Sequence, residues 1–149
     1  MNPNGLSPVE ILLVEDSPTD VLLAKEAFDY SRLANKLHTV SDGAEAMSFL
    51  RREGDHKDVP RPGLILLDLN LPKKDGREVL AEIKCDEDLK RIPVVVLSTS
   101  KSEVDILQAY GLHANCYIVK PVDFEKFAEV VRCIESFWFS VVTLPGSLK

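Results

Sequence analysis

Five short apolar runs, each followed by an amphipathic stretch, constrain the fold of this chain more than any other feature of its sequence. The runs are too short for helices, rich in β-branched residues and mostly apolar at successive positions, which is typical of strands buried on both faces. They cover residues 9–14, 36–40, 64–67, 94–97 and 116–119. Such strands need helices above and below them, so the pattern predicts a layered α/β fold.

Helical patterns separate these runs. Their apolar residues recur about every 3.6 residues, as in a helix with one buried face. The predicted helices cover residues 18–28, 44–52, 75–85, 102–112 and 123–139. Strand and helix alternate five times, which predicts a doubly wound parallel sheet with right-handed crossovers and helices on both faces.

Size and composition indicate a single domain. Of the 149 residues, 45% are hydrophobic and 28% are charged, which is close to ordinary globular usage. The charged segment 53–63 contains Pro60 and Pro62, which indicates a surface loop rather than a linker between domains. We therefore expect one domain over residues 1–149, with an apolar C-terminal tail over about residues 137–149.

Charge and hydropathy limit the partners that this chain can have. The net charge of −6 argues against non-specific nucleic-acid binding, which needs a basic surface. No apolar run approaches the roughly 18 residues of a membrane span, and residues 1–8 lack the features of a secretion signal. We expect a cytoplasmic protein that binds neither nucleic acid nor membrane.

Polar residues stand at the carboxyl ends of the predicted strands. In an open α/β sheet, ligands bind beyond these ends, where the strand order reverses. The residues concerned are Glu15, Asp16, Asp68, Ser98, Thr99 and Lys120. Carboxylates suit Mg²⁺, which prefers oxygen ligands, and a lysine with a hydroxyl can bind phosphoryl oxygens. The set is consistent with a magnesium ion and a phosphoryl group at this edge of the sheet.

Five motifs surround these residues. They are VEDS at 14–17, SDGAEA at 41–46, LLDLNLPKKDG at 66–76, PVVVLST at 93–99 and YIVKP at 117–121. Through them the chain resembles, over residues 9–139, the receiver domain of two-component response regulators. The resemblance implies a flavodoxin-like receiver fold with strand order 2-1-3-4-5 and five helices. It also implies a phosphoacceptor signalling protein rather than an enzyme with a separate substrate, and it leaves self-dephosphorylation open.

The resemblance gives four residues a role in phosphorylation and its readout. Asp68 is the expected phosphoacceptor, and Lys120 is expected to pair with the phosphoryl group. Ser98 is the expected switch hydroxyl, and Tyr117 is the aromatic residue that changes rotamer with it. Ordinary core packing is the alternative interpretation of Tyr117.

The resemblance also implies a metal site. Its expected ligands are Glu15, Asp16, Asp68 and the backbone carbonyl of Asn70, with Glu15 acting through water. The expected ion is Mg²⁺, with Mn²⁺ able to substitute. Clustered carboxylates repel one another until a dication enters, so we expect phosphorylation to require the metal.

The end of the last predicted helix is more apolar than a solvated terminus should be. Phe137, Trp138, Phe139 and Val142 crowd this region, yet a helix buries only one face, so we expect an interface there. A tail folded back on its own domain is the alternative. Together with DLNLPKKDGREVLAEIK and RIPVVVLSTS, the tail resembles the small response regulators of cyanobacterial phytochrome histidine kinases. This implies a phytochrome-type histidine kinase partner and a homodimer formed through the C-terminal region.

Other functions on the same fold fit the sequence less well. A phosphohydrolase that uses an aspartyl phosphate needs Asp-x-Asp, whereas Asp68 is followed by Leu69 and Asn70. A flavin module needs a phosphate-binding loop after the first strand, where Glu15 and Asp16 would repel phosphate. With no output domain expected, signalling should proceed through protein–protein contacts. A receiver-fold interaction protein that acts as a dimer without phosphorylation is the remaining alternative.

Overall fold

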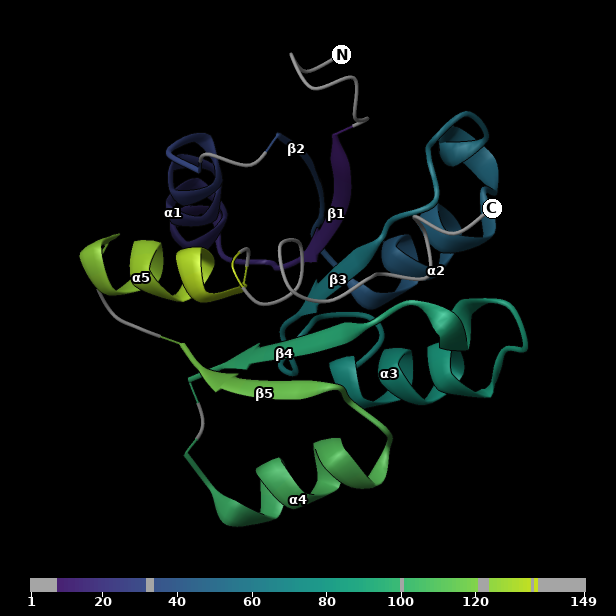
Figure 1. Ribbon diagram of the computed structural model, residues 1–149. Helices are drawn as coiled ribbons and strands as arrows, with labels where there is room; N and C mark the ends of the chain where they lie inside the picture. The colour runs from purple at the N-terminus through teal and green to yellow at the C-terminus, as the bar shows by residue number, and fades with distance from the viewer. Residues whose placement is uncertain (1–7, 32–33, 100, 121–123, 135, 137–149) are drawn as a thin grey trace.

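A five-stranded sheet with helices on both faces forms the centre of the computed structural model (Figure 1), which describes residues 8–31, 34–99, 101–120, 124–134 and 136. The strands are β1 (Val9–Val14), β2 (Asn35–Val40), β3 (Leu64–Leu67), β4 (Val94–Ser98) and β5 (Cys116–Val119). The helices are α1 (Pro18–Asp29), α2 (Gly43–Arg51), α3 (Gly76–Cys85), α4 (Glu103–Gly111) and α5 (Phe124–Ile134). Two short 3₁₀ turns are η1 (Gly54–His56) and η2 (Leu89–Arg91).

The sheet is parallel throughout, with strand order β2-β1-β3-β4-β5. This confirms the predicted doubly wound α/β fold and its strand order. The order reverses between β1 and β3, because the chain runs outward from β1 to β2 and then returns to β3. Val14 pairs with Leu67 in the register, so the residues that follow these two strands emerge side by side. A ligand site is expected at this point of the sheet.

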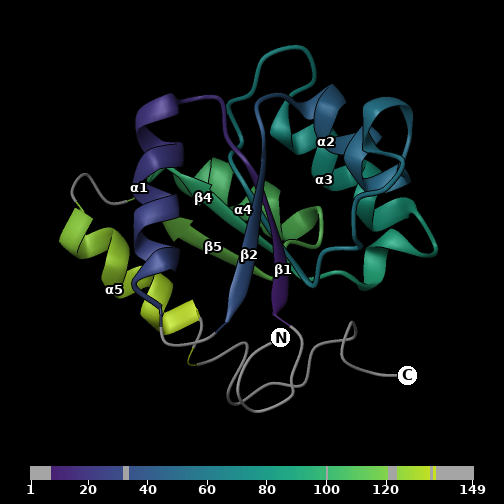
Figure 2. The same cartoon turned by 90° about the horizontal axis from the view of Figure 1, so that it is seen from above.

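Alternate residues of the central strands supply two separate cores. Ile11 and Leu13 of β1 pack with α1 and α5, whereas Leu12 and Val14 pack with α2 and α3. Ala109 brings α4 into the second cluster. Figure 2 shows α1 with α5 on one side of the sheet and α2 with α3 on the other. The buried apolar faces of the strands therefore fix the sheet rigidly between two helical layers.

The helix boundaries differ slightly from those predicted. Asp75 and Ser102, expected to lie inside helices, are N-caps whose side chains accept hydrogen bonds from backbone N–H groups further along the helix. Arg52, also expected to be helical, has a left-handed φ of 55° and ends α2. The last predicted helix is described only over Phe124–Ile134, and the predicted tail lies outside the described residues.

The predicted surface loop 53–63 contains η1; residues 53–58 are mostly exposed, whereas residues 59–63 are half-buried apart from the buried Pro62. Gly63 ends the loop, and its N–H donates a hydrogen bond to the Glu10 carbonyl at 2.8 Å. The loop therefore enters the sheet at the start of β3, away from the carboxyl ends of the strands. Among the described residues, no helix combines the length and apolarity that crossing a bilayer requires.

Candidate functional site

The predicted site residues lie at the carboxyl ends of the strands. Glu15 follows β1, Asp68 follows β3, Ser98 ends β4 and Lys120 follows β5. Hydrogen bonds between the strand ends fix their backbones. Asp68 N–H donates to the Val14 carbonyl at 3.1 Å, and Lys120 N–H donates to the Ser98 carbonyl at 2.7 Å. The backbone hydrogen bonds of the sheet thus bring together residues that are far apart in the sequence.

Three carboxylates form an acid cluster at the point where the strand order reverses. Glu15, Asp16 and Asp68 each place one oxygen within 4.8 Å of the others. Glu15 is only 3% exposed, whereas Asp16 is exposed. Carboxylate oxygens are ligands that Mg²⁺ and Mn²⁺ accept, and the exposed side of Asp16 lets water complete the coordination shell. The acid cluster therefore fits a divalent cation.

The ammonium group of Lys120 contacts three carboxylates. It pairs with Glu15, and its Nζ lies 2.9 Å from Asp20 Oδ2 and 3.3 Å from Asp68 Oδ2. The Asp20 contact is not among the predicted ones, because sequence reasoning considered only residues at strand ends. The spacing Ser17-x-x-Asp20 was the available signal. It resembles a capping box, and the Ser17 hydroxyl does accept a hydrogen bond from the Asp20 N–H at 3.3 Å.

Burial and charge shift the titration of the central pair. Burial of the Glu15 carboxyl raises its pKa to about 7, against the lowering effect of its hydrogen bond from Lys120, and the charge of Asp68 raises it further. Burial of the Lys120 ammonium lowers its pKa, but hydrogen bonds to Glu15 and Asp20 and the charge of Asp68 outweigh this and raise it. Lys120 therefore stays cationic. Its single positive charge does not balance the negative charges of the carboxylates around it.

The Asp68 carboxylate is oriented through both of its oxygens. Asn70 N–H donates to Oδ1 at 3.1 Å, while Lys120 approaches Oδ2. The loop that follows is anchored at α3, because Gly76 N–H donates to the Leu69 carbonyl at 2.8 Å. A Cβ on residue 76 would overlap the Asp68 carbonyl oxygen and lie 2.6 Å from Leu69 Cα, so only glycine fits there. The Asn70 carbonyl stays a predicted metal ligand.

The two predicted switch residues lie on neighbouring strands. Ser98 is fully buried at the end of β4. Tyr117 on β5 is partly buried against the core that includes α4, and its N–H donates to the Tyr110 hydroxyl at 3.2 Å. The exchange of rotamers assigned to this pair stays a prediction. The predicted interface residues Phe137, Trp138, Phe139 and Val142 lie outside the described residues.

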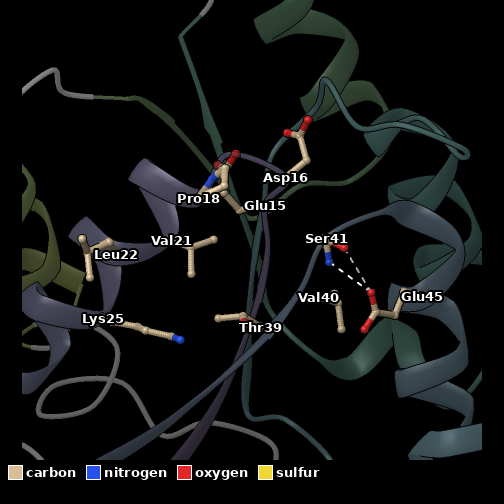
Figure 3. Close-up of a pocket in the computed structure, with 10 residues that line it drawn as sticks. All are labelled: Glu15, Asp16, Pro18, Val21, Leu22, Lys25, Thr39, Val40, Ser41 and Glu45. Atoms are coloured by element: carbon tan, nitrogen blue, oxygen red, sulfur yellow. Dashed lines mark hydrogen bonds between the residues drawn. The ribbon is translucent and has the colours of Figure 1, made fainter.

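An open cavity of about 500 Å³ adjoins the acid cluster. Figure 3 shows Glu15 and Asp16 at its upper end, between side chains of α1 and of β2 and α2. On the α2 side, the Ser41 N–H and hydroxyl both donate to the Glu45 carboxylate at 3.3 Å. Glu15 and Asp16 line this open cavity, whereas Asp68 and Lys120 are not among its lining residues.

Known proteins share this sequence and fold. Residues 11–132 match the response regulator receiver domain family. The response regulator Rcp1 of Synechocystis sp. is 52% identical over 147 residues, covering 99% of this chain and 100% of that protein.

Two solved structures resemble the fold closely. The phosphorylated cyanobacterial phytochrome response regulator RcpA has a TM-score of 0.89 and 55% identity, over 93% of this chain and 99% of that one. The Mn²⁺-bound form of response regulator Rcp1 has a TM-score of 0.86 and 54% identity, with the same coverage of 93% and 99%. These matches confirm the resemblance inferred from the motifs. The chain therefore belongs to the family of response regulators built on the receiver domain.

Proposed function

We propose that this response regulator accepts a phosphoryl group on Asp68 from a histidine kinase, in a reaction that requires Mg²⁺. The observation that carries the proposal is the position of the Asp68 carboxylate. It belongs to the acid cluster with Glu15 and Asp16, and its Oδ2 lies 3.3 Å from Lys120 Nζ. A nucleophile placed between a cation site and a fixed ammonium is the arrangement that phosphoryl transfer needs.

Glu15, Asp16 and Asp68 would hold Mg²⁺, or Mn²⁺ in its place, with the Asn70 carbonyl as a further ligand and Glu15 acting through water. The bound ion would neutralise charge on the phosphoryl oxygens during transfer. The oxygen donors of the acid cluster support this assignment. The Mn²⁺-bound form of the relative Rcp1 supports it independently.

In the transfer, one Asp68 carboxylate oxygen attacks the phosphorus of a phosphohistidine on the kinase. A new O–P bond forms, the P–N bond breaks, and its electron pair stays on the imidazole nitrogen. Lys120 pairs with a phosphoryl oxygen, and Asn70 N–H keeps the carboxylate oriented for attack. Because the transition state is loose, these residues act mainly by positioning and by charge.

Ser98 and Tyr117 would transmit the effect of phosphorylation from the site to the protein surface. Phosphorylation places roughly −1.5 to −2 charges on the site. The Ser98 hydroxyl would move to hydrogen-bond the phosphoryl group, and Tyr117 would turn into the vacated space. Since Tyr117 packs against the same core as α4, this would reshape the α4 face and change its protein–protein contacts.

We further propose a phytochrome-type histidine kinase as the partner, because the similar RcpA is described as a cyanobacterial phytochrome response regulator. The protein would act in the cytoplasm as one domain, without binding nucleic acid or membrane.

It would form a homodimer through its C-terminal region, with Phe137, Trp138, Phe139 and Val142 in the interface. Light scattering on the wild type and on a Trp138→Ala, Phe139→Ala variant tests the dimer. A wild type that is monomeric across micromolar concentrations would rule it out.

The phosphorylation proposal is tested by intact-protein mass after incubation with acetyl phosphate. Wild type with Mg²⁺ should gain the mass of one phosphoryl group, whereas Asp68→Asn should gain none. Chelation of the metal should abolish the gain in the wild type. If no gain occurs with acetyl phosphate or with a phosphorylated phytochrome-type kinase, the protein acts without phosphorylation, and the dimeric interaction protein becomes the better account.

A further inference from the structure

The first turn of α1 contributes a carboxylate that the metal site does not use. Asp20 is not a member of the acid cluster of Glu15, Asp16 and Asp68. Its Oδ2 instead lies 2.9 Å from Lys120 Nζ, which is closer than Asp68 Oδ2 at 3.3 Å. The Asp20 backbone is fixed by the N-cap of α1, because its N–H donates to the Ser17 hydroxyl. The contact therefore joins the first turn of α1 to Lys120.

The number of donors on Lys120 sets a limit. An ammonium group has three N–H donors, and Glu15, Asp20 and Asp68 supply three carboxylates. A phosphoryl oxygen that pairs with Lys120 must therefore displace one of these partners.

Burial decides which partner leaves. The Glu15 side chain is 3% exposed, so water cannot readily replace its contact with Lys120, and its release is unfavourable. Asp68 is the attacking group, so its carboxylate stays beside the lysine until the new O–P bond has formed. The Asp20 side chain is 28% exposed and can be hydrated once it is released. Asp20 is therefore the partner that the lysine gives up most readily.

We propose that Asp20 is a positioning residue that holds Lys120 in the unphosphorylated protein and competes with the phosphoryl group for it. This competition restrains phosphorylation of Asp68, and it rests on the proposed function. The negative charge of Asp20 adds to the restraint, because it raises the potential energy of an anionic phosphodonor beside the lysine. The position of Asp20 in α1 makes this helix part of the control of the site.

The test measures the rate constant of phosphorylation by acetyl phosphate at saturating Mg²⁺, using intact mass over time. Asp20→Asn removes the charge and keeps the shape, and it should react roughly fivefold faster, the effect of losing a partly exposed ion pair at the upper end of the usual range. Asp20→Ala is a second neutral variant with the same expectation. Asp20→Glu keeps a carboxylate that can reach Lys120 and should restore the wild-type rate. Glu26→Gln, an exposed charge on the same helix, should leave the rate unchanged.

Faster reaction in both neutral variants, with rescue by Asp20→Glu, supports the competition, because a merely structural defect would slow the reaction. An unchanged or slower rate in the neutral variants overturns it, and so does an equal acceleration in Glu26→Gln or in Asp20→Glu. A wild type that gains no phosphoryl group from acetyl phosphate or from a phosphorylated phytochrome-type kinase overturns the proposed function, and the role of Asp20 with it. Phosphorylation of the wild type with no response to Asp20 overturns only the role of Asp20.

Discussion

Arg77 Nη2 lies 2.8 Å from Asp105 Oδ1 and so joins the first turn of α3 to the first turn of α4. Arg77 Nε also donates to Gln108 Oε1 at 2.9 Å, one turn further along α4. Because α3 begins directly after the loop that carries Asp68, this arginine links the phosphorylation loop to the helix that the proposed switch reshapes. The link is electrostatic, and the side chains of Arg77 and Asp105 are partly exposed to solvent, so it can break without disturbing the core.

Replacing Arg77 with Gln should loosen α4. Loss of the ion pair and the hydrogen bond should lower the free energy of unfolding by about 1 kcal/mol. The amides of α4 should exchange with deuterium faster, while those of the β-sheet change little. Arg91→Gln is the matched control, because Arg91 is exposed and its side chain makes no hydrogen bond or ion pair among the described residues. Equal protection of α4 in both variants would show that the bridge does not restrain the helix.

Gly76 should not tolerate a side chain. Gly76→Ala forces a methyl group against the Asp68 carbonyl oxygen and Leu69 Cα, and these backbone atoms cannot move without shifting the phosphorylation loop. We expect a loss of about 1–3 kcal/mol in the free energy of unfolding and slower phosphorylation. Gly111→Ala is the control, since a Cβ there meets nothing within 4 Å and alanine favours helix. Denaturant unfolding of both variants checks the contrast, and comparable destabilisation in the two would contradict it.

Metal binding should depend on pH through Glu15. Burial raises the pKa of its carboxyl to about 7, so the carboxyl carries a proton increasingly often as pH falls below that value. A cation must displace this proton, so affinity for Mg²⁺ should weaken as pH falls, by up to roughly tenfold per pH unit well below the pKa, and level off above it. Calorimetric titrations at pH values on both sides of the pKa measure this. Glu15→Gln should bind more weakly throughout with a flatter pH dependence, and an identical slope would exclude Glu15 as the group responsible.

The hydroxyl of Tyr110 should stabilise the edge strand β5. It accepts the Tyr117 N–H at 3.2 Å, a backbone group on a strand at the edge of the sheet. Tyr110→Phe should cost about 0.5–1.5 kcal/mol of unfolding free energy and expose the Tyr117 amide to exchange. Tyr30→Phe removes a hydroxyl from a ring that is 78% exposed and should cost almost nothing. Slow exchange of the Tyr117 amide in Tyr110→Phe would mean that another acceptor replaces the hydroxyl.

The strands of the sheet could be predicted from the sequence because the pattern that identifies each strand is local. Each strand is a short apolar run that could be recognised by itself, and because successive side chains of a strand point to opposite faces, Leu12 and Leu13 lie in opposite cores. The acid cluster could also be predicted, because residues that follow parallel strands meet at one edge. The family motifs then supplied the order of the strands, which periodicity alone does not contain.

The contact between Asp20 and Lys120 could not be predicted in the same way. The two residues are 100 positions apart, and their meeting depends on where α1 packs and on the reach of a four-carbon side chain. The bridge between Arg77 and Asp105 likewise depends on the angle between two helices. Such contacts arise from tertiary packing, and sequence periodicity carries no information about them.

The loop 53–63 enters β3 at the end opposite Asp68. A strand of four residues separates the two, which corresponds to about 13 Å. The loop tip is exposed, and a side chain at Gly54 would meet nothing within 4 Å. Exposed tips of this kind tolerate insertions well. A fluorescent reporter grafted there would leave the phosphorylation end of the sheet uncovered, so the protein could be followed in living cells while a kinase works on its opposite end.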